Sequence, residues 1–169
     1  VLTVPLTTPP VNTGGPVTTL GGNADGFPVT DDTGMLTVFL PNGADYQTTP
    51  ITKDDIVLPR VVAAADVPAF MNDDVTQGII FMGIPSTYDA TPDDAIAILG
   101  PPDGTCAVQT SGAPISTPFG VATVVLYDGC GPGGAYSKVV MGVATSGTFV
   151  AIGVYLQGDG PATDMPGTA

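Results

Sequence analysis

The chain has 169 residues with 16 acidic, three basic and no histidine side chains, so its formal net charge at pH 7 is -13. Such a charge repels nucleic-acid phosphates and anionic lipid, which argues against nucleic-acid binding and binding to membrane surfaces. No run of about 18 apolar residues predicts membrane insertion, and without histidine Ser-His-Asp or Cys-His catalysis is impossible. The length suffices for one domain with its own core, and 23 glycines and 18 prolines favour strands and turns over long helices.

Residues 1–30 are rich in threonine, proline and glycine. We expect an extended arm here, because proline lacks the backbone N–H that a central strand needs. The segment lacks an initiator methionine and a basic leader, so Val1 is interpreted as the first residue after a cleaved signal peptide. A solvated linker is the simplest interpretation, with O-glycosylation as the alternative. The candidate glycosylation sites are Thr7, Thr8, Thr18 and Thr19.

The next motif is Asp32-Thr33-Gly34, the tripeptide that carries the catalytic carboxylate in aspartic proteases. That chemistry needs two carboxylates that share a proton, and the chain has no second Asp-Thr-Gly or Asp-Ser-Gly. The homodimeric enzymes also expect arginine after an apolar-apolar-glycine run, whereas proline follows residues 98–100 here. We therefore favour a turn leading into a strand, and an aspartic protease using Asp32 is the least favoured alternative.

Residues 31–157 are expected to form an α+β domain, an antiparallel sheet of about five to seven strands with one or two short helices packed on it. A helix is indicated within residues 91–102, where Thr91 can cap, Pro92 suits the first helical position and Gly100 can end it. A shorter helix is predicted over residues 66–71. The predicted strands are residues 35–40, 61–65, 78–83, 106–110, 121–128, 135–145 and 148–157.

The last predicted strand is apolar in both alternating positions, and the irregular residues 158–169 follow it as a tail. One side of this strand is expected to carry Phe149, Ala151 and Tyr155. The other side is expected to carry Val150, Ile152, Val154 and Leu156. Either both faces of the sheet are covered within the domain, which we favour, or one face and the arm meet another chain.

The chain has two cysteines, Cys106 and Cys130. The simplest interpretation is that they form one disulfide in an exported protein. A zinc site is improbable, because the chain offers only two cysteines and no histidine. Residues 23–27, NADGF, and several paired aspartates are typical of calcium-binding turns. No glutamate closes an EF-hand loop, so we expect caps and turns on an acidic surface. The sequence therefore predicts no catalytic residues, metal or cofactor.

Four segments, in their order along the chain, resemble a known family. They are Asp31 to Gly34 leading into LTVFLP, 59-PRVVAAADVPAFMND-73, 77-QGIIFMGIPST-87 and 126-LYDGCGPGG-134. Together they resemble a small extracytoplasmic domain of actinobacterial secreted proteins, serine proteases and membrane kinases, with a PsbP-like sandwich fold. The resemblance covers residues 31–157 and implies a Cys106–Cys130 disulfide in an exported, non-catalytic module. The helix that usually ends this family is not matched by residues 158–169.

Residues 1–6, VLTVPL, are apolar and extended, and the sheet lacks the family's closing helix. We therefore expect a non-enzymatic structural or interaction subunit, secreted and extracellular or at the cell surface, in which this arm contacts a neighbouring copy and builds a filament or surface array. The alternative is a secreted module that binds a small ligand or cation. The residues assigned to assembly are Val1, Leu2, Val4, Leu6, Phe149 and Tyr155.

Overall fold

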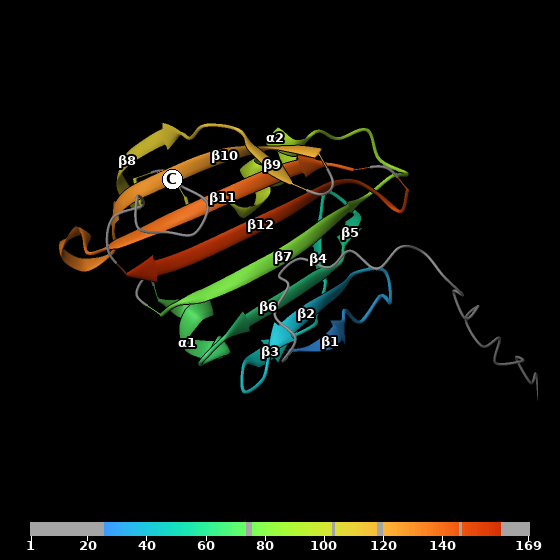
Figure 1. Ribbon diagram of the computed structural model, residues 1–169, viewed down its shortest axis with the longest axis horizontal. Helices are drawn as coiled ribbons and strands as arrows, with labels where there is room; N and C mark the ends of the chain where they lie inside the picture. Colours follow the sequence, from blue (N-terminus) through green and yellow to red (C-terminus); the bar gives the residue numbers. More distant parts are fainter. Residues whose placement is uncertain (1–25, 74–75, 103, 118–119, 146, 160–169) are drawn as a thin grey trace, which may run out of the picture.

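The computed structural model describes residues 26–73, 76–102, 104–117, 120–145 and 147–159 (Figure 1). These residues form one eight-stranded antiparallel sheet, two separate two-stranded sheets and two α-helices, which confirms the predicted α+β class. The elements are β1 (Gly26–Thr30), β2 (Thr37–Pro41), β3 (Asp45–Gln47), β4 (Ile51–Lys53), β5 (Ile56–Leu58), β6 (Arg60–Ala64), α1 (Val67–Asn72), β7 (Gly78–Pro85), α2 (Pro92–Leu99), β8 (Cys106–Ser111), β9 (Ile115–Thr117), β10 (Gly120–Cys130), the 3-10 turn η1 (Pro132–Gly134), β11 (Tyr136–Ala144) and β12 (Phe149–Asp159).

The main sheet has the strand order β3-β6-β7-β12-β11-β10-β8, and β9 pairs with the same edge of β10 as β8 does. All seven predicted runs are strands, and β10, β11 and β12 are consecutive antiparallel neighbours as expected. The run at residues 35–40 forms β2, which pairs with β1 outside the main sheet. The sheet exceeds the predicted number of strands because β3 and β9 have three residues each, too few to show an alternating pattern.

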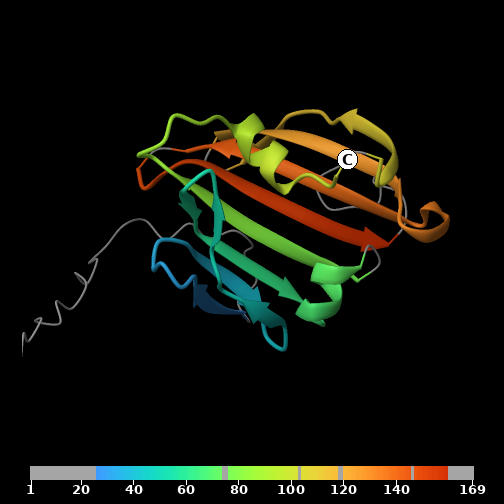
Figure 2. The same cartoon turned by 180° about the vertical axis from the view of Figure 1, so that it is seen from behind.

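One face of the main sheet is covered by α1, α2 and the β4–β5 hairpin (Figure 2). Helix α2 begins with a capping box, in which the Thr91 backbone N–H and hydroxyl both donate to the Asp94 carboxylate at 2.7 Å. Ala95 is completely buried against the sheet, and Ile98 and Leu99 pack beside it, as the helical spacing predicts. The helix is therefore held by a local cap and by burial of one apolar side.

The opposite face is covered by the β1–β2 hairpin, whose buried side chains pack against those of β6, β7 and β12. Val29 and Leu40 from the hairpin share a buried cluster with Phe81 and Val154 of the sheet. Both faces of these central strands are thus covered by described parts of the same chain. Strand β1 begins at Gly26 and β12 ends at Asp159, so the folded domain extends beyond the predicted 31–157 at both ends.

A β-bulge in β12 changes the predicted alternation of its side chains. The pairing of β12 with β7 shifts register between Phe149 and Ala151. Phe149 therefore packs on the hairpin face with Ile152 and Val154, whereas Ala151 and Tyr155 lie on the helix face. The expectation that Phe149 shares a side with Ala151 and Tyr155 was wrong, because strict alternation cannot anticipate an extra residue in the ladder.

Candidate functional site

The Asp-Thr-Gly motif lies in the turn between β1 and β2. The Asp31 carboxylate is 3% exposed and accepts four hydrogen bonds, from the backbone N–H groups of Thr33, Met35 and Leu36 and from the Thr33 hydroxyl, at 2.6 to 3.0 Å. Asp32 is exposed and accepts a 2.6 Å bond from the Thr48 hydroxyl. The Asp31 carboxylate thus organises the local backbone, as the turn interpretation expects, whereas the Asp32 carboxylate bonds to a side chain sixteen residues further along the chain.

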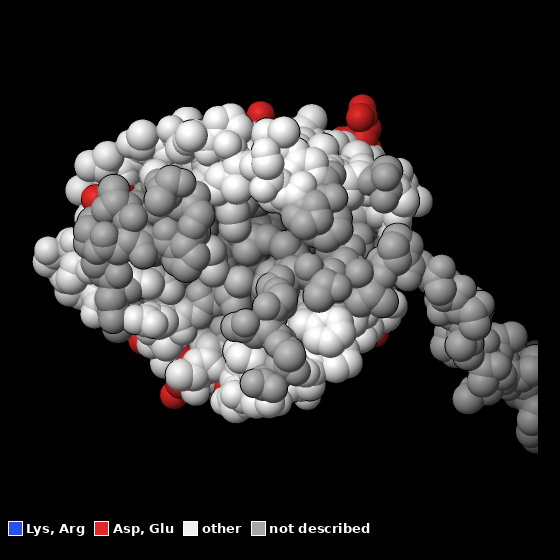
Figure 3. All heavy atoms as spheres, viewed as in Figure 1, with Lys and Arg blue, Asp and Glu red and all other residues white. Residues whose placement is uncertain are grey.

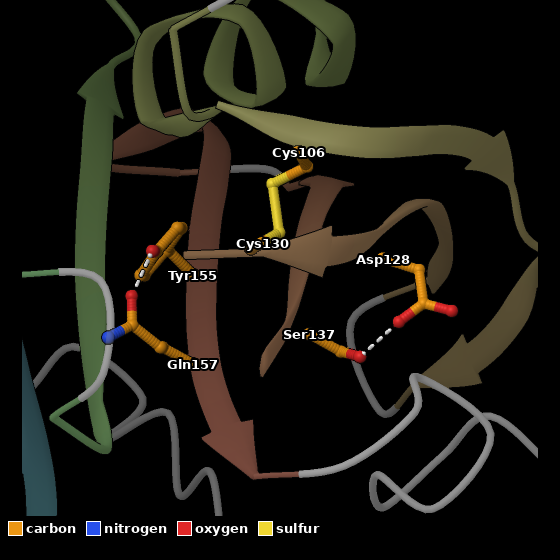
Figure 4. The surroundings of a disulfide bond; sticks show 6 residues. All are labelled: Cys106, Asp128, Cys130, Ser137, Tyr155 and Gln157. Carbon is orange, nitrogen blue, oxygen red and sulfur yellow. Dashed lines mark hydrogen bonds between the residues drawn. A yellow bond between two sulfur atoms is a disulfide. The ribbon is translucent and has the colours of Figure 1, made fainter. Parts of the chain in front are cut away.

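A second group of polar side chains surrounds the ends of β11 and β12 (Figure 4). The Tyr155 hydroxyl donates to Gln157 Oε1 at 2.8 Å, and Gln157 Nε2 donates to the Thr76 carbonyl at 2.6 Å. The Ser137 hydroxyl donates to the Asp128 carboxylate at 2.7 Å. These groups are largely buried and mutually satisfied, so the arrangement stabilises the sheet end.

The predicted disulfide between Cys106 and Cys130 is present, and it joins the first residue of β8 to the last residue of β10 (Figure 4). The two residues are directly paired across the ladder, with 4.0 Å between their Cα atoms. Cys130 is completely buried, while five of the six residues of β8 are exposed. The bond thus fastens an exposed edge strand to the core of the domain.

Strand β8 is the last strand on its side of the main sheet, and no described residue pairs with its outer edge. The Gly112 backbone N–H donates to the Val124 carbonyl at 2.9 Å, which marks a hydrogen-bonded pair of the β8–β10 ladder. Bonded positions alternate along an antiparallel strand, so Val108 and Thr110 also bond toward β10. The backbone N–H and C=O groups of Gln109 and Ser111 consequently point outward.

This edge lies in an unusually uncharged part of the sequence. Residues 104–127 contain no aspartate, glutamate, lysine or arginine, and Asp103 and Asp128 bound the run. A second such run occupies residues 1–24, ahead of Asp25. These are the two longest uncharged stretches of a chain whose net charge is -13, so contacts between them add little repulsion between copies. Figure 3 shows acidic atoms at the rim of one face of the domain.

The predicted assembly residues fall into two groups. Phe149 and Tyr155 are buried, at 9% and 8% exposure, and pack inside their own domain. Neither offers surface to a neighbouring copy. The other predicted assembly residues, Val1, Leu2, Val4 and Leu6, lie outside the described part of the chain. The candidate glycosylation sites Thr7, Thr8, Thr18 and Thr19 lie outside it as well. The sequence prediction missed the exposed edge of β8, although the uncharged run around it is visible in the sequence.

Within the described residues, no three acidic or cysteine side chains come together in a way that could hold a metal ion. No helix in the same part of the chain has both the length and the apolar character needed to cross a bilayer. No protein-family model, curated protein or solved structure matches this chain. The resemblance to the extracytoplasmic PsbP-like domain therefore stays a prediction.

Proposed function

We propose that this protein is a non-catalytic structural or interaction subunit that assembles with copies of itself through its N-terminal arm, here defined as residues 1–10. The observation that carries the proposal is the distribution of charge along the chain. All 16 acidic residues lie after residue 24, while the arm combines Leu2, Val4 and Leu6 with no charge at all.

Electrostatics limits where two such molecules can touch. Each copy has a net charge of -13, and at physiological salt this repulsion is screened over about 8 Å. A contact between acidic surfaces therefore opposes assembly, whereas an uncharged apolar segment adds attraction without adding repulsion. Complete burial of a leucine or valine side chain contributes about 1.5–3 kcal/mol. Several such side chains have to be buried together, because association also costs the two copies translational and rotational freedom.

The disulfide supports a location outside the cytosol. Structural disulfides persist mainly in oxidising compartments, and Cys106–Cys130 joins two strands of the main sheet. We place the protein among secreted or cell-surface proteins, where its acidic surface keeps single copies soluble until the arms engage. Head-to-tail use of one arm by each copy would give an open filament or a surface array.

The direct test is the concentration dependence of size for the full chain, measured by light scattering with analytical ultracentrifugation. Deleting residues 1–10, or changing both Leu2 and Val4 to aspartate, should leave monomers at concentrations where the parent assembles. Thr7→Asp with Thr8→Asp is the matched control, because it adds the same charge without removing apolar side chains. It should weaken assembly less than the first pair does.

An assembly state unaffected by the deletion would contradict the role of the arm. A parent chain that remains monomeric at every concentration would contradict self-assembly altogether. The remaining class would then be a secreted module that binds a small ligand or cation. Adding calcium and measuring the melting temperature would test that class, since a ligand that binds only the folded state raises it.

A further inference from the structure

We propose that the outer edge of β8, Cys106–Ser111, is the acceptor for the N-terminal arm of a second copy, which adds a strand to the main sheet there. The inference rests on the proposed assembly function and names the surface that the arm would bind. It identifies the contact as backbone pairing along a sheet edge, with side chains contributing apolar burial.

The ladder between β8 and β10 determines which backbone groups of β8 face outward, where an added strand could bind them. Because the Gly112–Val124 pair is hydrogen-bonded, the N–H and C=O groups of Gln109 and Ser111 face away from β10. An edge strand with unpaired groups of this kind is a template for pairing with another chain. These two alternate residues offer a donor and an acceptor each, which suits a short added strand.

The two edges of the main sheet differ in their suitability. The opposite edge is β3, which has three residues and includes Asp45. The Asp45 carboxylate accepts from the Tyr46 and Val67 backbone N–H groups, so this short edge carries a charge and is tied to α1. Strand β8 is twice as long and contains no charged residue or proline, the features that normally protect an edge.

Residues 1–6 match the requirements of an added strand. A strand paired along one edge uses the backbone groups of alternate residues only. If Leu2, Val4 and Leu6 pair with β8, Pro5 lies at a position whose missing N–H is not needed. Six residues, VLTVPL, meet the six residues of β8 before Pro9 and Pro10 interrupt the arm. The register therefore accommodates the proline inside the apolar segment.

The position of β1 favours a neighbouring copy as the donor. Strand β1 covers β6 and β7, toward one end of the strand order, whereas β8 is at the other end (Figure 1). An arm that leaves Gly26 would have to cross the whole sheet to reach β8 of its own copy. Donation to a neighbour, which the proposed assembly requires, repeats from copy to copy because donor and acceptor are different surfaces.

A backbone substitution at the edge tests the acceptor in the full chain. Gln109→Pro removes one outward N–H and leaves the bonds between β8 and β10 in place, since Gln109 does not donate to β10 in this register. We expect the concentration for half-maximal assembly to rise about fivefold or more, the effect of losing one net hydrogen bond. Gln109→Thr keeps the N–H and serves as the control, with assembly unchanged.

Cross-linking supplies a second measurement that does not depend on how well Gln109→Pro folds. Copies with Val4→Cys are mixed with copies carrying Gln109→Cys under a glutathione redox buffer, and peptide mapping identifies the new bond. We expect a disulfide between residues 4 and 109 of different copies. Thr52→Cys, exposed on β4 far from β8, is the control acceptor and should give little product.

The outcomes separate the two proposals. If deletion of residues 1–10 abolishes assembly while Gln109→Pro has no effect and no bond to residue 109 forms, the acceptor assignment is overturned and the proposed function stands. If the deletion has no effect, both the acceptor assignment and the proposed function are overturned. A chain carrying both cysteines that closes the bond within one copy at high dilution would show self-pairing, which overturns donation between copies.

Discussion

Gly142 on β11 and Gly153 on β12 face each other across the ladder, and together they form the surface on which α2 lies. A Cβ atom on Gly142 would overlap the Pro92 carbonyl group at the start of the helix. A Cβ atom on Gly153 would lie 2.7 Å from Leu99 Cδ1. The absence of side chains at these two positions thus sets how closely the helix approaches the sheet.

Substituting either glycine by alanine should therefore destabilise the fold. Overpacking of a filled interior costs about 1–3 kcal/mol. We expect Gly142→Ala to have the larger effect, because it meets backbone atoms that cannot rotate away, whereas Leu99 can change its rotamer. Urea unfolding followed by circular dichroism would measure both. Equal stability of the two variants would indicate that α2 shifts as a unit to relieve the overlap.

The Asp31 carboxylate should be the more important member of the Asp31-Asp32 pair. Asp31→Ala leaves the buried N–H of Leu36 and two further backbone donors without their acceptor, which should cost about 2–4 kcal/mol. Asp32→Ala removes one exposed bond from Thr48 and should cost less than about 1 kcal/mol. Chemical denaturation measures both, and a larger loss for Asp32→Ala would contradict the structural interpretation of the motif.

Local chemistry made some elements predictable. Helix α2 could be placed because its cap, its first proline and its terminating glycine are close together in the sequence, and each acts on neighbouring backbone groups. The disulfide was predictable because two cysteines admit only one pairing within the chain. The strands of β10, β11 and β12 were recognised because long apolar runs alternate with glycine-rich turns.

Features that depend on distant parts of the chain were less predictable. Strand β1 contains Pro28, which argued for an arm, yet β1 pairs only with β2 and a two-stranded sheet tolerates proline. The side of Phe149 depended on a bulge that arises from pairing with β7. The exposed edge of β8 follows from strand order, which no local pattern reveals.

Removing the disulfide should both lower stability and loosen the proposed acceptor edge. Cys106→Ser with Cys130→Ser opens a loop whose closure contributes about 3.5 kcal/mol in the chain-entropy model. We expect a loss of about 2–4 kcal/mol in urea unfolding. Hydrogen exchange should rise in β8 and at the end of β10 more than in β11, because β8 has a neighbour on one side only among the described strands. Uniform exchange across the sheet would contradict this local role.

The capping box of α2 should contribute a measurable pH dependence. The pKa of Asp94 is held below its ordinary value of 3.8, first by the Thr91 side-chain hydrogen bond, then by the Thr91 backbone, with a smaller contribution from Lys53. A carboxylate with a depressed pKa in the folded state stabilises the fold above its unfolded pKa. This stabilisation is lost as the pH falls from about 4 through the lower folded value.

The test compares the melting temperature of the parent chain with that of Asp94→Asn between about pH 2 and pH 6. The parent should be the more stable near pH 6, and the difference should shrink toward pH 2, where the parent's carboxyl group is protonated. Asp93→Asn is the matched control, because it removes the same charge from the same exposed turn without touching the Thr91 bonds. If Asp93→Asn reproduces the full pH dependence, the effect belongs to the charge near the helix N-terminus, and the hydrogen bonds of the capping box contribute nothing specific.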